Sequence, residues 1–282
     1  MKRSSVSDEE QGTAKGGKDG NKSLVMSLAK ACRVLEIFDS QEPELNLSEI
    51  AKRADLDAGT AHRFVRTLVS LGYLQQAEGA KRYRLGLKVI DLGFNAVSRM
   101  DVHFLSSPIL RSLVGGVVEA ASVGILSGAE VIYIGRVQAG LNPLGVSRGI
   151  GSRIPAYCSA IGQAILAFLP PDRRLQILKS ARRPKFTPQT LVTVAEIEER
   201  LALVREQGYA LCDQELIPGV RALAAPIVDR NGYPHASLSV GASSFPFTVE
   251  QFVAYSAPRV VEGARQLSEA LSTDVAIYRP HQ

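Results

Sequence analysis

The sequence has few cysteines and no long apolar run. Its three cysteines, Cys32, Cys158 and Cys212, are widely separated, without a CxxC pair or a histidine at zinc-ligand spacing. This pattern argues against a disulfide framework or a metal site and suits a reducing cytosol. No apolar segment approaches the ~20 residues of a membrane-spanning helix, and residues 1–20 lack the apolar core of a signal peptide. We therefore expect a soluble, cytoplasmic protein with no metal, no cofactor and no membrane partner.

The charge excess is small and lies mostly in the first third of the chain. The 282 residues, 45% of them hydrophobic, suffice for one large domain or two ordinary ones, and the net charge is +5. Residues 1–90 hold 15 Lys/Arg and 12 Asp/Glu, which gives +3 of that +5. Residues 1–22 are polar and charged, and we expect a disordered tail there.

Residues 47–71 have the pattern of two short helices joined by a tight turn. Apolar residues at 47, 50, 51 and 54 share one face of the first helix. Asp57 is a suitable N-cap for the second helix, which carries its own apolar stripe. That stripe consists of Ala61, Phe64, Val65, Leu68 and Val69. The pattern predicts a helix-turn-helix whose second helix presents small, hydroxylic and basic groups on its other face.

The segment after these helices has the pattern of a basic hairpin. Gly72 suits the end of a helix, and residues 73–76 and 82–85 read as two strands. Such a hairpin after a recognition helix is the wing of a winged helix. We place the DNA-binding domain at residues 23–86. Its predicted DNA contacts are Ser48, Thr60, His62, Arg63, Arg66, Lys81 and Arg82.

Different roles are expected within this set. Thr60, Arg63 and Arg66 would reach bases or the DNA backbone, and Lys81 and Arg82 would contact phosphates. His62 alone does not indicate a contact with DNA. The alternative interpretation is an ordinary solvated basic face. The order of helix, turn, basic helix and basic hairpin favours DNA binding.

From residue 87 onward the pattern changes to a linker and then to mixed helices and strands. Residues 87–100 predict a linker helix that contributes to a dimer interface. Residues 101–282 predict an α+β domain, because hairpins alternate with helices around an antiparallel sheet. Strands are expected at 122–126, 131–137, 209–212, 222–228 and 236–240. Helices are expected at 108–120, 159–168, 172–181, 194–207 and 249–271, with a loop at 140–155.

Several segments, taken in order, resemble the IclR family of bacterial transcriptional regulators. They are the winged helix, the linker helix, Gly151-Ser-Arg-Ile-Pro-Ala-Tyr157 and Gly208-Tyr209. Within the family, residues 153–159 and 213–216 look most like regulators of aromatic-acid catabolism. The resemblance implies that residues 101–282 form a GAF-like antiparallel sheet domain flanked by helices, which serves effector binding and oligomerisation. It further implies a dimer or tetramer and a small organic acid as effector.

The resemblance also implies where the effector binds. Its carboxylate would meet the start of the helix at Ser159, Ala160 and Ile161, where backbone N–H groups favour an anion. Later strands would complete the pocket with Cys212, Ala222, Ser239 and Gly241. The sequence departs here from the glyoxylate- and pyruvate-type pattern, which has Asp, Cys and Ser at positions 212, 222 and 241. A less polar and roomier pocket suits a larger, flatter ligand such as an aromatic acid.

Arg221 is a further candidate for the effector site. An arginine at the start of an apolar strand could clamp a carboxylate with two hydrogen bonds. A salt bridge at the surface or at an interface is the equally open alternative.

Two other functions compete with that of an effector-responsive regulator. Residues 145–149 spell GxSxG, and Asp213 or Asp229 and then His235 follow Ser147 in the chain order of an α/β-hydrolase. The residues after Ser147 cannot start a helix at once, which argues against a serine hydrolase. The second alternative is a winged-helix protein whose C-terminal domain only oligomerises.

Overall fold

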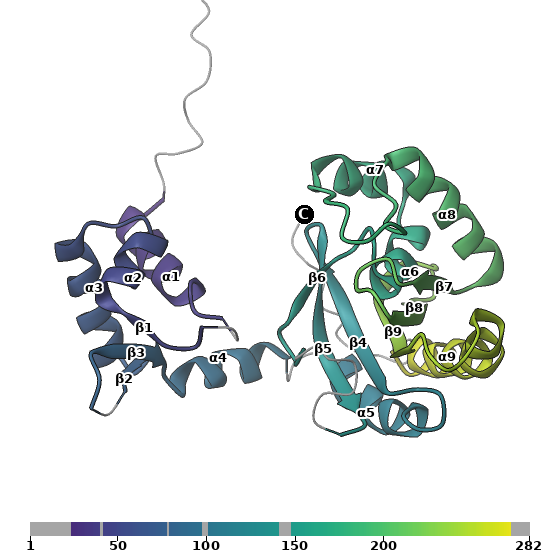
Figure 1. The fold of residues 1–282 in the computed structure, drawn as a ribbon, viewed down its shortest axis with the longest axis horizontal. Coiled ribbons are helices and arrows are strands. Elements are labelled where there is room, and N and C mark those ends of the chain that lie inside the picture. Colours follow the sequence, from purple (N-terminus) through teal and green to yellow (C-terminus); the bar gives the residue numbers. More distant parts are fainter. Residues whose placement is uncertain (1–23, 40–41, 78, 98–100, 141–147, 272–282) are drawn as a thin grey trace, which may run out of the picture. The chain divides into compact units, whose positions relative to one another are not determined.

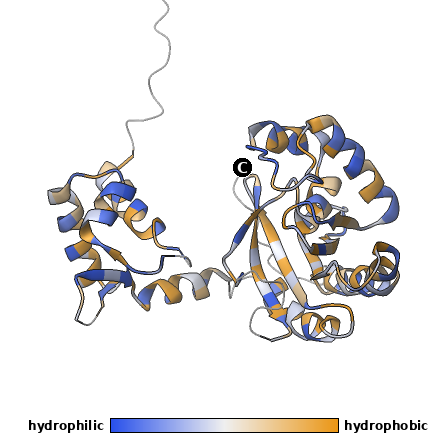
Figure 2. Cartoon of the chain, in the orientation of Figure 1, coloured by the Kyte–Doolittle hydropathy of each residue, from blue (hydrophilic) through white to orange (hydrophobic). Residues whose placement is uncertain are grey.

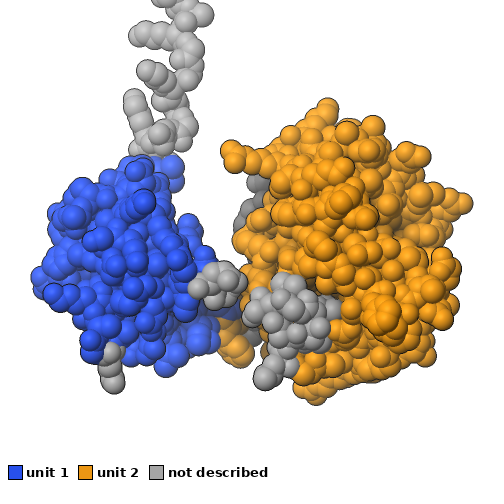
Figure 3. All heavy atoms as spheres, in the orientation of Figure 1, with its two compact units in different colours: residues 1–93 blue, residues 94–282 orange. Residues whose placement is uncertain are grey.

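The computed structural model describes residues 24–39, 42–77, 79–97, 101–140 and 148–271. The chain forms two compact units, which divide between Gly93 and Phe94 (Figure 3). No described helix is long and apolar enough to cross a membrane. The tail predicted at residues 1–22 lies outside the described residues, as do residues 98–100 of the predicted linker.

The first unit is a winged helix-turn-helix (Figure 1). Three helices pack around a core in which Val34, Ile50 and Val65 are buried, and a three-stranded sheet of order β1-β3-β2 completes it. A capping box between Asn46 and Glu49 begins the second helix. The elements are α1 (Met26–Glu36), β1 (Leu45–Asn46), α2 (Leu47–Arg53), α3 (Ala58–Ser70), β2 (Leu74–Gln76) and β3 (Arg82–Leu85). The next helix, α4 (Lys88–Val97), contains the boundary between the two units.

The second unit is built on a six-stranded antiparallel sheet of order β6-β5-β4-β9-β8-β7. The predicted hairpins are β4–β5 and β8–β9, and β4 pairs with β9 in the middle of the sheet. Consecutive hairpins from distant parts of the chain therefore lie side by side. The strands are β4 (Ala120–Ser127), β5 (Glu130–Gln138), β6 (Arg153–Pro155), β7 (Ala210–Asp213), β8 (Val220–Val228) and β9 (Pro234–Ser243).

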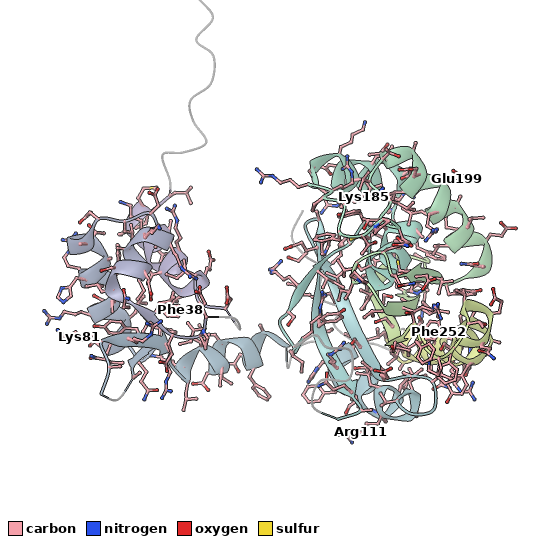
Figure 4. All side chains as sticks on the ribbon, viewed as in Figure 1. Phe38, Lys81, Arg111, Lys185, Glu199 and Phe252 are labelled. Atoms are coloured by element: carbon pink, nitrogen blue, oxygen red, sulfur yellow. The ribbon has the colours of Figure 1, made fainter. Side chains whose placement is uncertain are left out.

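Helices cover both faces of this sheet, so its strands are largely apolar (Figure 2). One core lies between the sheet and α6, which α7 and α8 cover. The other core lies between the sheet and α5 and α9, where Phe252 is 1% exposed (Figure 4). The predicted α+β class is confirmed. The helices are α5 (Asp101–Leu113), α6 (Ala160–Phe168), α7 (Pro171–Ser180), α8 (Val194–Gln207) and α9 (Val249–Leu271).

The structure corrects two predicted elements. The helix expected at 108–120 lies earlier, at Asp101–Leu113, and contains Pro108. Gly115 and Gly116 adopt φ angles of +128° and +60°, which an α-helix cannot continue through. Within the loop expected at 140–155, Arg153–Pro155 forms the edge strand β6, paired with β5. Three residues are too few to show a strand's alternation in sequence.

Candidate functional site

The second helix of the helix-turn-helix, α3, has one face in the core and one face exposed. Ala61, Val65 and Leu68 are buried. The Asp57 carboxylate accepts a hydrogen bond from the backbone N–H of Thr60 at 2.8 Å, so the predicted N-cap is confirmed. The face opposite the core carries the exposed side chains His62, Arg63, Arg66 and Thr67.

The basic side chains of this unit fall into two groups. Arg63, Arg66 and Lys81 are exposed and form no ion pair with the described residues. Figure 4 labels Lys81 on the wing. Arg82 instead donates a 2.6 Å hydrogen bond to the Glu44 carbonyl and lies 3.4 Å from Glu49. It ties the wing to the start of α2 and is half-buried. A phosphate contact from Arg82 remains a prediction, beside this structural role.

A pocket of about 670 Å³, including its mouth, lies between α6 and one face of the sheet. Two neighbouring rows of side chains, each running across paired strands, form its floor. The first row is Arg136, Ser122 and Ser239, and the second is Ala120, Gly241, Ala222 and Cys212. Because every side chain in the second row is small, space for a ligand remains above it.

The β5 side of the pocket is positively charged. The Arg136 guanidinium donates a 2.7 Å hydrogen bond to the Ser122 hydroxyl and lies over the Tyr133 ring, at 5.5 Å from its centroid. Arg148 also lines this wall. Burial lowers the pKa of Arg136 and raises that of Tyr133 from their ordinary values. Neither arginine forms an ion pair with a described acidic residue.

The roof of the pocket is the start of α6. The Ser159 hydroxyl donates to the Pro155 carbonyl at 2.7 Å and accepts from the backbone N–H of Gly162 at 3.3 Å. The N–H groups of Ala160 and Ile161, at the first two positions of the helix, have no acceptor within the helix. The helix dipole adds partial positive charge at this end, which favours an anion.

The β7 side of the pocket carries a buried carboxylate. Glu215, 3% exposed, accepts hydrogen bonds from Arg200 at 2.6 Å and from Gln163 at 3.2 Å. Burial raises the pKa of this carboxyl, and Arg200 opposes that shift. The pocket therefore has a cationic wall on β5 and an acceptor wall beside β7.

Seven predicted effector-site residues line this one pocket: Ser159, Ala160, Ile161, Cys212, Ala222, Ser239 and Gly241. Arg136, Arg148 and Glu215 were missed. The available signal for Arg136 was an arginine within the apolar pattern of residues 131–137, which is unusual for a strand covered on both faces.

The structure corrects the placement of Arg221. This residue does not line the pocket. Its guanidinium donates to Asp213 at 2.8 Å and to the Phe247 carbonyl at 3.0 Å, and it lies over the Phe252 ring of α9. Neighbouring residues of a strand face opposite sides of the sheet, so Arg221 and Ala222 cannot both face α6. The alternative, a salt bridge, is what the structure contains.

The backbone after residue 147 does not have the conformation that a serine hydrolase of this type requires. Residues 145–147, including Ser147, lie outside the described residues. Directly after them, Arg148–Ser152 form a loop and a turn that lead into strand β6, where a nucleophile elbow requires a helix. His235 lies 2.9 Å from Asp229, which accepts backbone hydrogen bonds in the β8–β9 hairpin.

The three thiols differ in accessibility, and this leads to a testable prediction. Cys32 is exposed, whereas Cys158 and Cys212 are buried beside the pocket. Burial raises the pKa of Cys158 to about 12 and that of Cys212 well above its ordinary value, so neither forms the reactive thiolate near neutral pH. With Ellman's reagent at pH 7.5, one thiol per chain should react quickly, and Cys32→Ser should remove that phase. Fast reaction of two or three thiols would contradict the buried placement.

Among the described residues, no group of three or more His, Cys, Asp or Glu side chains could hold a metal ion. The combination of winged helix and enclosed pocket defines a transcriptional regulator with a ligand-binding domain. The sequence matches the family described as "Bacterial transcriptional regulator IclR C-terminal" over residues 94–269 and the "IclR helix-turn-helix domain" over residues 27–78. The chain belongs to the IclR family of bacterial transcriptional regulators.

Similar proteins come from several branches of this family. The regulator XynR of Escherichia coli is 32% identical over 77% of this chain and 86% of its own. The Pca regulon regulatory protein of Pseudomonas putida is 29% identical over 78% of this chain and 75% of its own. The Pca regulon regulatory protein agrees with the predicted resemblance to regulators of aromatic-acid catabolism, whereas XynR belongs to another branch.

Two solved structures show the same fold. A transcriptional regulator from Rhodococcus sp. RHA1 superposes with a TM-score of 0.77 at 31% identity, covering 88% of this chain and 98% of that one. An IclR homologue from Microbacterium hydrocarbonoxydans, complexed with 4-hydroxybenzoate, has a TM-score of 0.74 at 25% identity, covering 86% and 99%.

Proposed function

We propose that this protein is a cytoplasmic regulator whose affinity for operator DNA changes when a small aromatic carboxylic acid binds between α6 and the sheet. The observation that carries the proposal is the pocket itself, which combines a helix N-terminus, a floor of small side chains and two arginines that form no ion pair with described residues. A planar acid would fill the space over Ala222 and Gly241, and its charge would meet the cationic wall. The 4-hydroxybenzoate complex of the Microbacterium homologue supports this ligand class.

The DNA-binding half of the proposal rests on α3 and the wing. In this arrangement α3 enters the major groove, and the wing meets phosphates or the adjacent minor groove. Arg63 and Arg66 of α3, with Lys81 of the wing, have no competing acidic partner among the described residues. These side chains are therefore available for phosphates and base edges.

The protein would act as a dimer or tetramer, because two half-sites require two winged helices. Large apolar side chains on α1 and along α4 support such an assembly. Leu87 is 78% exposed, and Ile90 and Phe94 are each 64% exposed. A row of this kind on one surface helix is typical of a protein interface.

The direct test is fluorescence anisotropy with DNA from upstream of the protein's own gene. The titration is run at two salt concentrations, with and without benzoate, 4-hydroxybenzoate, pyruvate and glyoxylate. Tight, salt-sensitive binding that one aromatic acid alters is the expected result. Tight binding that every acid leaves unchanged would favour a purely oligomerising C-terminal domain.

Filling the pocket should abolish the response to the acid without weakening operator binding. Ala222 lies in the row of small side chains on the pocket floor. Ala222→Phe places a ring in the space assigned to the ligand, so the acid response should be lost while operator affinity without acid stays within about twofold. The same anisotropy titration measures both quantities. A full acid response in Ala222→Phe would show that the effector binds elsewhere.

A further inference from the structure

The cationic wall contains an arginine whose hydrogen bonds are incomplete. Arg136 donates to the Ser122 hydroxyl through Nη1, but its buried Nε has no acceptor. An unpaired donor in a buried place costs free energy that an acceptor would recover. Arg136 also forms no ion pair with a described carboxylate, unlike Arg174, Arg200 and Arg221 in the same unit.

The surroundings of Arg136 increase its need for an anion. Arg148 lines the same wall, and its charge disfavours that of Arg136. The nearest aromatic group, Tyr133, is buried and stays neutral because burial raises its pKa. Two guanidinium groups with only neutral neighbours leave the wall with an excess positive charge. A bound carboxylate would neutralise part of it.

The opposite side of the pocket has the reverse polarity. Glu215 lies beside β7, and three strands, β4, β9 and β8, separate β7 from the β5 wall that carries Arg136. Four strand-to-strand steps of about 4.8 Å amount to roughly 19 Å in a flat sheet. The Glu215 carboxylate already accepts hydrogen bonds from Arg200, Gln163 and Cys212. A ligand carboxylate placed beside Glu215 would be repelled.

We infer that the pocket is polarised and that Arg136 selects and orients the carboxylate of the ligand. The carboxylate would pair with Arg136 and Arg148 at the β5 wall and lie away from Glu215, because a ligand with one aromatic ring is too short to bridge the two walls. This assignment rests on the proposed function. It adds the orientation of the ligand and names Arg136 as the residue that selects for the negative charge of the ligand. The start of α6 lies between the two walls and contributes N–H donors to the bound acid.

The test is a cycle of ligand and protein changes, measured by isothermal titration calorimetry on the full-length protein. The probes are 4-hydroxybenzoate and its amide, 4-hydroxybenzamide. Wild-type protein should bind the acid about 10- to 100-fold more tightly than the amide, because the amide has no charge to pair with arginine. In Arg136→Met this preference should fall to about threefold or less, and in Arg136→Lys part of it should remain.

Arg153→Met is the matched control. Arg153 is an exposed arginine of β6, paired with Glu130, and does not line the pocket. This variant should keep the full preference for the acid over the amide. Thermal unfolding of Arg136→Met should stay close to that of wild type, because loss of the hydrogen bond to Ser122 is offset by removal of the buried Nε, which has no acceptor.

The experimental outcomes distinguish a wrong ligand orientation from a wrong proposed function. If 4-hydroxybenzoate binds and alters operator affinity but Arg136→Met keeps the acid preference, the proposed function stands and the polarised site is wrong. If wild type binds none of the probes, both the ligand class and this assignment are wrong, while operator binding is judged by its own titration.

Discussion

Replacing Arg63 and Arg66 together with alanine is expected to weaken operator binding by about 100-fold or more. Each arginine is exposed on α3, away from the core formed by Ala61, Val65 and Leu68. An arginine that contacts a base is worth about 1–3 kcal/mol, and a phosphate contact adds to the salt dependence of binding. Anisotropy titrations of the operator and of an unrelated duplex, at two salt concentrations, measure both effects.

The pattern of the loss identifies the role of each side chain. If one of these arginines contacts a base, replacing that arginine alone with alanine should lower operator affinity and sequence preference together. A phosphate contact predicts equal losses on both duplexes and a smaller salt slope. Arg173→Ala removes the same charge from an exposed site on α7 and serves as the control. Operator affinity within about twofold of wild type in the double variant would contradict the placement of α3 in the major groove.

Gly162→Ala is expected to destabilise the second unit by about 3 kcal/mol or more. A Cβ atom at this position of α6 would lie 2.3 Å from both the Cα and the carbonyl oxygen of Ala156, which are backbone atoms and cannot rotate away. The helix would have to move off the segment that leads from β6, at a cost beyond ordinary overpacking. For a unit of this size the melting temperature should fall by roughly 6–12 °C, as circular dichroism can measure.

Gly149→Ala provides the comparison for that experiment. It adds the same methyl group within the second unit, where the new Cβ would meet no atom within 4 Å. Its melting temperature should stay within about 2 °C of wild type. If Gly162→Ala had the same melting temperature as Gly149→Ala, α6 would not pack on Ala156 as closely as the structure shows.

The elements best predicted from sequence are those whose ends are determined by neighbouring residues. The helices at 194–207 and 249–271 were predicted with the bounds that the structure has. For α8 the reasons are local, because Thr193 and Glu196 form a capping box and Gly208 adopts a φ of +81°. The short strands β1 and β6 depend on partners far along the chain, and sequence periodicity gave no sign of them.

The position of the pocket and the small residues of its floor could be predicted from the sequence, but the charged residues that line it could not. The resemblance to the family supplied the start of α6 and the small residues of the floor. Which arginines face the ligand depends on pairing that only the fold determines. Arg221 lies opposite Asp213 in the β7–β8 register and pairs with it, whereas Arg136 lies opposite Ser122 in the β4–β5 register and is left without a carboxylate.

The most direct test of the regulator account is the coupling between the two ligands. Calorimetry gives the Kd of 4-hydroxybenzoate with and without saturating operator DNA, and anisotropy gives the Kd of the operator with and without saturating acid. If both ligands bind to one coupled protein, the two ratios must be equal, and typical couplings are about 5- to 150-fold. We predict equal ratios within this range. Tight binding of each ligand with both ratios at one would contradict the account, because the acid would then have no influence on DNA binding.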